Sequence, residues 1–293
     1  MTARSRQSGG GRRPRRSGVL FFLAVVAVVV AVAVAVWRGT GPLPDPPQCT
    51  ATVANRTVVL APDQAENASL IAAIGVERGL PARAVSIALA TAYQESKIRN
   101  LTGGDRDSVG IFQQRPSQGW GTVAQISDEY YAINKFYDAL EKIHGYQTMR
   151  ITEAAQKVQR SGYPEAYEAH APDARALASA LTGYSAGGMF SCVVRTPEGH
   201  GTAAQASASL TKAYGDLAIA RTGSRQDFTV ALATDTDGDR KGWSIAQFLV
   251  AHADRLKVTR VSFDGKTWRT GSDSEKGWVV SAASATRVTV SLG

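Results

Sequence analysis

Glu95 is the residue whose surroundings most suggest chemistry. It lies in the stretch TAYQESKIRN (residues 91–100), at the end of a helix pattern over 82–95 in which small apolar residues recur at three- and four-residue spacing. Glu95 falls within about 20° of Ala88 on that apolar stripe, and the carbonyl end of a helix disfavours negative charge. We therefore expect a raised pKa, unless the last turn frays and releases the side chain to solvent. A carboxylic acid that stays protonated can supply the proton that the leaving oxygen of a cleaved glycosidic bond needs.

Asp105 and Asp107 are candidates for a second catalytic carboxylate, because both lie in the turn-rich segment that follows Glu95. An inverting glycosidase holds its two carboxyl groups about 6.5–9.5 Å apart around a water molecule, and a retaining enzyme holds them about 5–5.5 Å apart. Either aspartate could instead pair with Arg99 or Arg106, or cap a turn.

An uncharged run, GVLFFLAVVAVVVAVAVAVW (residues 18–37), follows an arginine-rich tail over 1–17. A run of about 20 apolar residues is long enough to cross a hydrocarbon core, and a basic flank stays in the cytoplasm. These features predict a single-pass signal-anchor in the cell membrane, with the part after Trp37 extracytoplasmic. A cleaved signal peptide is the alternative, although its apolar region is usually only about 7–15 residues long.

The charges and cysteines limit the partners and cofactors that we expect. Seven of the arginines behind the net charge of +8 lie at or before Arg38, so the rest of the chain is nearly neutral and no nucleic-acid surface is expected. Cys49 and Cys192 both fall on the predicted extracytoplasmic side, where a disulfide can persist; two unrelated thiols are the alternative. Neither belongs to a CxxC pair or lies near a histidine pair, so no metal and no cofactor are expected.

The chain divides by composition into five predicted parts. These are a basic cytoplasmic tail (1–17), a transmembrane signal-anchor (18–37), a stalk linker (38–50), a mainly α domain (51–221) and a small α+β module (227–293). Helices are expected over 64–79, 82–95, 122–144, 152–161, 172–182 and 202–220. The stretch DTDGDR (235–240) lacks the glycine and glutamate of a calcium loop and is interpreted as a turn.

The motifs around Glu95 resemble those of the soluble lytic transglycosylases and the wider lysozyme-like superfamily. They are QES (94–96), GIFQ (110–113) and SDEYYAINKFYDALEK (127–142). The resemblance covers about residues 64–185 and implies a lysozyme-like domain in which Glu95 is the catalytic acid and then the base. The substrate-binding residues expected from these motifs, and from the placing of one tryptophan between glycines, are Ser96, Gly110, Gln113, Gln114, Trp120, Tyr137 and Gln156.

Two departures from the family pattern leave the product open. Phe112 stands where the family has methionine, and AAQKVQRS (154–161) stands where it has an Ala-Tyr-Asn stretch, so that Gln156 or Gln159 would have to serve there. A lytic transglycosylase needs no second carboxylate, because the sugar's own hydroxyl attacks and gives a 1,6-anhydro end. A muramidase gives a reducing end instead.

Longer runs are similar to exported lysozyme-like proteins of high-GC Gram-positive bacteria. They are GDRDSVGIFQQRPSQGWGT (104–122) and AAQKVQRSGYPEAY (154–167), and the similarity extends from Cys49 beyond Cys192, which favours the disulfide. The run GWSIAQFLVAHADRLKVTRVSFDGKTW (242–268) resembles the later half of a zinc-peptidase-like fold. The last predicted strand of the small module, ATRVTVSL (285–292), carries none of the histidines that such a fold uses to bind metal.

Together these features predict a membrane-anchored, extracytoplasmic glycosidase that cleaves peptidoglycan glycan strands, of lytic transglycosylase or muramidase type. The alternative is a lysozyme-like protein that binds peptidoglycan or assists wall assembly without cleaving. Whether Glu95 is desolvated and aimed into an open groove distinguishes the two.

Overall fold

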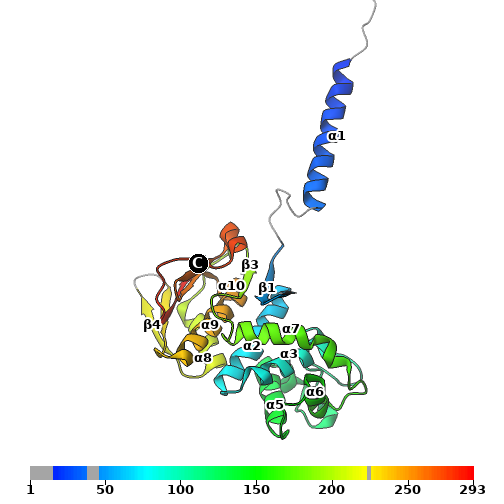
Figure 1. The fold of residues 1–293 in the computed structure, drawn as a ribbon, viewed down its shortest axis with the longest axis vertical. Helices are drawn as coiled ribbons and strands as arrows, with labels where there is room; N and C mark the ends of the chain where they lie inside the picture. The colour runs from blue at the N-terminus through cyan, green and yellow to red at the C-terminus, as the bar shows by residue number, and fades with distance from the viewer. Residues whose placement is uncertain (1–15, 38–45, 223–225) are drawn as a thin grey trace, which may run out of the picture. The chain divides into compact units, whose positions relative to one another are not determined.

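The computed structural model describes residues 16–37, 46–222 and 226–293. Most of the predicted tail (1–17), most of the stalk (38–50) and the middle of the predicted boundary at 222–226 lie outside the described residues. The chain forms two compact units, Met1–Asp45 and Pro46–Gly293. The first holds helix α1 (Arg16–Trp37), and the second holds all the other labelled elements (Figure 1).

The prediction of a transmembrane anchor over 18–37 is wrong. Among the described residues, no helix is both long enough and apolar enough to cross a membrane. The predicted location, a single-pass protein of the cell membrane, rested on this anchor and is therefore also wrong.

The unit Pro46–Gly293 contains two antiparallel sheets beside its helices, so the predicted mainly α class is also wrong. One sheet has the strand order β2-β1-β3, and the other has the order β4-β5-β9-β6-β7-β8. The strands are β1 (Gln48–Val53), β2 (Arg56–Leu60), β3 (Phe190–Val193), β4 (Ala218–Thr222), β5 (Asp227–Ala231), β6 (Val258–Phe263), β7 (Lys266–Arg269), β8 (Val279–Val280) and β9 (Arg287–Leu292). The first four are short and lie where the sequence was expected to be mostly helical.

Most of the expected helices are present, with altered ends. The helices of this unit are α2 (Pro62–Glu77), α3 (Ala82–Ser96), α4 (Val123–Ile126), α5 (Glu129–Glu141), α6 (Ile151–Gln159), α7 (Ala171–Leu181), α8 (Ala203–Tyr214), α9 (Thr236–Ala251) and α10 (Ala253–Leu256), with short 3₁₀ turns η1 (Pro116–Gln118), η2 (Ala166–His170) and η3 (Gly271–Lys276). The expected helix over 122–144 is divided because the Asp128 carboxylate caps α5 at the Tyr131 N–H. Asp235 likewise caps α9, so that DTDGDR begins a helix instead of forming a free turn.

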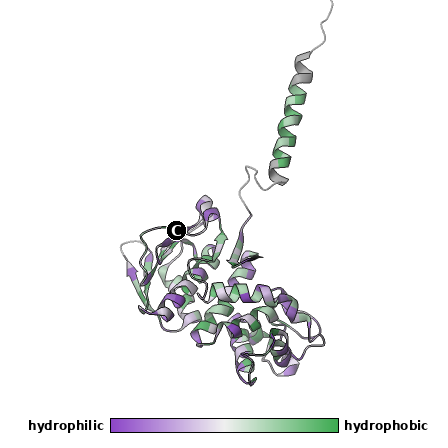
Figure 2. Ribbon diagram, viewed as in Figure 1, coloured by the Kyte–Doolittle hydropathy of each residue, from purple (hydrophilic) through white to green (hydrophobic). Residues whose placement is uncertain are grey.

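Helix α3, which carries Glu95, is surrounded by other elements. It packs against α2, α5, α6, α7 and η2, and its residues from Ala84 to Ala92 are all buried. The small side chains along this stretch allow neighbouring helices to approach closely. Figure 2 shows that the other helices of this unit carry hydrophobic and hydrophilic residues side by side, as expected for helices with one face in a core.

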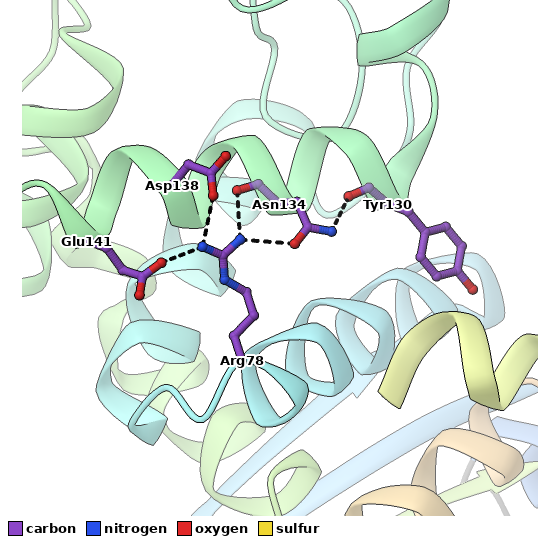
Figure 3. Close-up of polar contacts among 5 residues, drawn as sticks. All are labelled: Arg78, Tyr130, Asn134, Asp138 and Glu141. Carbon is purple, nitrogen blue, oxygen red and sulfur yellow. Dashed lines mark hydrogen bonds and ion pairs between the residues drawn. The ribbon is translucent and has the colours of Figure 1, made fainter. Parts of the chain in front are cut away.

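Arg78 at the end of α2 fixes that helix to α5 (Figure 3). Its guanidinium donates to the backbone and side-chain oxygens of Asn134 at 3.2 and 3.0 Å, to Asp138 at 2.8 Å and to Glu141. The Asn134 amide in turn donates to the backbone carbonyl of Tyr130. Because one guanidinium reaches three residues of α5, the two helices have a defined register.

The predicted disulfide between Cys49 and Cys192 is confirmed. The two cysteines are directly opposite each other on β1 and β3 and are almost fully buried. The bond therefore ties the start of the compact unit to a strand 143 positions later.

The six-stranded sheet has one apolar face and one polar face. Phe228, Val261, Phe263 and Trp268 are fully buried on the apolar face, where α9 packs with the ring of Trp243 5.3 Å from that of Phe263. The Trp268 indole N–H also donates to the carbonyl of Cys192 at 3.1 Å. The region predicted as a small module thus packs within the same compact unit as the helices.

Candidate active site around Glu95

Glu95 is the penultimate residue of α3, and the helix end around it is closed. Lys97 and Ile98 have left-handed φ values of 55° and 59°. Their backbone N–H groups donate to the carbonyls of Tyr93 and Ala92 at 2.9 Å each. Bonds of this kind satisfy the last carbonyls of a helix, so the turn is not frayed and the Glu95 side chain stays partly buried.

Two polar side chains from later elements reach Glu95. The hydroxyl of Tyr167, from η2, donates to Glu95 Oε1 at 2.7 Å. Gln159, the last residue of α6, lies near enough to Glu95 to affect its pKa and donates through Nε2 to the carbonyl of Phe112 at 2.7 Å. The Gln159 Oε1 atom is buried and has no partner among the described residues. Glu95 therefore lies where the end of α3, the segment 110–113, α6 and η2 meet.

The environment of Glu95 favours the protonated acid. Burial raises the pKa of Glu95, and the hydrogen bond from Tyr167 and the nearby Gln159 amide lower it by less. No cationic side chain of the described chain contributes to this pKa shift. Burial also raises the pKa of the Tyr167 phenol, which keeps it a hydrogen-bond donor. A carboxyl that remains neutral to higher pH than an exposed glutamate can act as a proton donor.

Ser96 and Gly110 shape the loop beside Glu95. The Ser96 hydroxyl donates to the carbonyl of Ile111 at 2.7 Å and accepts from the Arg99 N–H at 3.1 Å, and its side chain is buried. Gly110 has a φ of +82°, and a Cβ there would lie 2.7 Å from the carbonyl oxygen of Ile126. Both residues therefore have a structural role that the motifs alone did not reveal.

Gln113 and Gln114 use their amides within the same loop. Gln113 accepts from the Ser108 hydroxyl at 3.0 Å and donates to the carbonyl of Gly110 at 3.1 Å. Gln114 is almost fully buried, with Nε2 3.5 Å from the carbonyl of Ala132. Neither glutamine hydrogen-bonds to Glu95.

None of the remaining predicted substrate residues has a described hydrogen bond to Glu95. Tyr137 is fully buried in the core, where its hydroxyl donates to the carbonyl of Ile71 at 2.9 Å. Trp120 is partly buried. Gln156 is paired with Ser161 through two hydrogen bonds of 2.8 and 3.0 Å.

The two aspartates of the loop have other partners. Asp107 accepts from Arg115 Nε at 2.6 Å and from the Ser117 N–H at 2.8 Å, at the start of η1. These hydrogen bonds lower the pKa of Asp107. The Asp105 side chain is 94% exposed, with Arg106 3.9 Å away. Neither carboxylate shares a hydrogen bond with Glu95, so nothing in the described contacts pairs two acids.

A shallow cavity of about 570 Å³ lies elsewhere in the unit. It is lined by residues of α4, α5 and α8 and their flanks, namely Ala124, Gln125, Asp128, Tyr130, Tyr131, Asn134 and Lys212. Glu95 and its partners are not among them. Within the described ranges, no group of three or more His, Cys, Asp or Glu side chains could hold a metal ion.

Comparison with known families gives one partial match. Residues 204–287, from α8 to the start of β9, match the family described as VldE, C-terminal domain. The match covers less than half of the chain and does not include Glu95, so it shows only what this segment is similar to. Among curated proteins, none matches the chain.

Tyr167 was not predicted as a site residue, and Gln159 only as an alternative to Gln156. Tyr167 is the last residue of the run AAQKVQRSGYPEAY, and one of several tyrosines near it. Sequence spacing cannot tell that η2 turns this one toward α3. Its position follows from the packing of η2 on α3.

Proposed function

We propose that the protein is a glycosidase that cleaves peptidoglycan glycan strands, with Glu95 as the general acid and then the base. The observation that carries the proposal is the partly buried Glu95 carboxyl held by the Tyr167 hydroxyl at 2.7 Å. Desolvation without a neighbouring cation raises the pKa of such a carboxyl and so favours its protonated form. That is the state from which it can protonate a glycosidic oxygen.

In the proposed reaction, Glu95 donates its proton to the leaving oxygen as the bond to the sugar breaks. The resulting carboxylate keeps the hydrogen bond from Tyr167 and can then take a proton from the attacking hydroxyl. Tyr167 thus orients Glu95 in both steps, and the nearby Gln159 is held in place by its hydrogen bond to the carbonyl of Phe112.

The positions of Asp105 and Asp107 favour the lytic transglycosylase route over a route with a second catalytic carboxylate. Asp107 is engaged with Arg115 and Ser117, and Asp105 is almost fully exposed. A route without a second carboxylate, in which the sugar's own hydroxyl attacks and leaves a 1,6-anhydro end, fits these contacts better than one that needs a paired base. We therefore propose the lytic transglycosylase type, in keeping with the resemblance of the QES and GIFQ motifs.

Digestion of purified peptidoglycan tests the proposal. The full chain, its Glu95→Gln variant and the control Glu153→Gln are incubated with the substrate, and the soluble products are read by mass spectrometry. Glu153 is an exposed residue of α6, so its variant should behave as the parent does. Release of anhydro-ended fragments by the parent and the control, but not by Glu95→Gln, is expected.

Absence of release by a folded parent chain would contradict the proposal. If the parent then still sediments with peptidoglycan, the glycosidase proposal gives way to a non-catalytic protein that binds peptidoglycan. Reducing ends in place of anhydro ends would retain Glu95 as the acid and overturn the transglycosylase route. Circular dichroism of every variant establishes that the comparison is made between folded chains.

A further inference from the structure

The polar face of the six-stranded sheet carries an arrangement that the site around Glu95 does not use. Strand residues alternate between the two faces, and the face opposite the buried apolar side carries hydroxyl-bearing and charged residues together with Ala231 and Val279. We define the polar face by the residues Asp227, Thr229, Arg260, Ser262, Thr267, Arg269, Arg287, Thr289 and Ser291. Helix α9 packs on the other side, against Phe263.

Hydroxyl groups form a row across four strands of this face. Thr229 on β5 pairs with Thr289 on β9, Thr289 with Ser262 on β6, and Ser262 with Thr267 on β7. The Ser262 and Thr267 hydroxyls are 2.8 Å apart, and that of Thr267 is 2.9 Å from Ser281. Thr267 is almost fully buried, so the partly exposed hydroxyls of Thr229, Ser262 and Thr289 are the donors and acceptors that a hydroxyl-rich ligand can reach.

Two arginines stand directly opposite each other in the neighbouring row of the same face, which they share with Ser291. Arg260 on β6 pairs with Arg269 on β7, which places their Cβ atoms about 4.5–5.5 Å apart. Like charges in this position destabilise a sheet. Arg260 donates to the Ser291 hydroxyl at 2.7 Å, and that hydroxyl donates to Asp227 at 3.3 Å. No carboxylate of the described chain therefore forms an ion pair with either guanidinium.

The guanidinium of Arg269 is free to bind an anionic ligand. Its side chain is exposed and makes no hydrogen bond or ion pair with the described residues. The nearby carboxylate of Asp273 is held by Lys276 at 2.7 Å. Arg287 adds a third positive charge to the same face, against the single acid Asp227.

We propose that this face binds an anionic polyol chain joined by phosphodiesters, with Arg260 and Arg269 on a phosphate and the hydroxyl row on the polyol. A phosphate offers oxygens to two guanidinium forks at once, and its charge would relieve the repulsion between the two arginines. A single-stranded nucleic acid fits less well, because the polar face has no aromatic side chain on which bases could stack. The proposal does not depend on Glu95 or on any glycosidase activity.

Binding of the full chain to biotinylated poly(glycerol phosphate), followed by biolayer interferometry over a range of salt concentrations, tests the proposal. Arg269→Gln is the first variant, because its side chain has no described bond to lose, and Arg260→Gln/Arg269→Gln is the second. Arg221→Gln is the charge-matched control, because Arg221 pairs with Phe228 and so belongs to the other side of the sheet. Thr289→Val tests the hydroxyl row.

The parent and Arg221→Gln should bind alike, and the double variant should bind at least about tenfold more weakly. Each lost guanidinium should lower the slope of log affinity against log salt by about 1. Thr289→Val should weaken binding without changing that slope. Undiminished binding by the double variant, or no binding by the parent at low salt, overturns the proposal. Equal binding of the parent to polyglutamate or to single-stranded DNA also overturns it, by showing a non-specific cationic surface.

Discussion

The Tyr167 hydroxyl lies 2.7 Å from the Glu95 carboxylate and donates a hydrogen bond to it, although the two residues are 72 positions apart in the chain. Tyr167 is fully buried, so this bond is shielded from water and has a fixed direction. It connects η2 to the end of α3, and it is the contact on which the proposed role of Glu95 most depends.

Tyr167→Phe should lower activity while leaving the fold intact. The variant keeps the buried ring and removes only the hydroxyl, so the carboxylate formed when Glu95 gives up its proton loses a hydrogen bond that contributes about 1.5–3 kcal/mol to a charged group. Because that bond lowers the pKa of Glu95, its loss should move the basic limb of the pH–rate profile to higher pH. Product release measured across a pH series checks both effects. An unchanged profile and rate would show that Tyr167 does not act on Glu95.

Glu95→Gln should stabilise the folded chain at neutral pH. The pKa of Glu95 is raised on folding, so its contribution to stability is full below the unfolded pKa and is lost as the pH rises through the folded one. Because glutamine stays neutral at every pH, the variant does not lose this stability when the pH rises. Thermal unfolding at neutral pH and at about pH 4 should give a higher midpoint for the variant only at neutral pH. A higher unfolding midpoint for the parent than for the variant at neutral pH would contradict the raised pKa of Glu95.

Gly110→Ala should destabilise the loop that supports Glu95. The left-handed φ of +82° and the approach of Ile126 both oppose a side chain at this position, and we expect a loss of about 1–3 kcal/mol. Gly103→Ala is the matched control, because a Cβ at Gly103 meets nothing within 4 Å. Urea unfolding of the two variants distinguishes them, and equal stabilities would contradict the backbone argument.

His252 should make the chain less stable as the pH falls. Burial lowers its pKa to about 3, below the ordinary value of 6.5, so the unfolded chain takes up the proton first. Stability is then full above about pH 6.5 and decreases as the pH drops toward the folded pKa. Urea unfolding of His252→Gln at several pH values should give a flatter curve than the parent. A pH dependence as steep as that of the parent would contradict this account of His252.

Reduction of the Cys49–Cys192 disulfide should lower stability substantially. The bond closes a loop of 143 positions, for which the chain-entropy model gives about 4–5 kcal/mol. Urea unfolding with and without a reducing agent, compared with the Cys49→Ser/Cys192→Ser double variant, measures the loss. If the reduced chain and the double variant are as stable as the parent, the bond is not a main support of this fold.

Local patterns in the sequence predicted the helices well where one stripe is buried. The apolar spacing over 82–95 gave α3 nearly to its ends, because its burial against five other elements follows from that stripe. The strands β1 to β4 were missed because each is short and partly exposed. Helix α8 ends at Tyr214, earlier than the predicted end at residue 220, because Gly215 follows it with a φ of +70°.

The site was predicted less completely than the helices. The unfavourable position of Glu95 is local to α3 and could be read from spacing. Tyr137 has the same amphipathic chemistry as a substrate-contacting tyrosine, and only the packing of α5 on α2 places it in the core with its hydroxyl on Ile71. Ser96 and Gly110 were chosen by motif, whereas their described contacts are with backbone groups of the loop. The run over 18–37 predicted a membrane crossing from its lack of charge, and this was wrong among the described residues.

Titration of the Glu95 side-chain carboxyl tests the central claim most directly. The full chain, labelled with ¹³C at glutamate carboxyl carbons, is followed by NMR as the pH changes, and Glu95→Gln assigns the resonance by its disappearance. A midpoint clearly above the ordinary glutamate pKa of 4.5 is the predicted result. A midpoint at or below that value would show that Glu95 is ionised at neutral pH like any exposed glutamate, and would contradict its role as the proton donor.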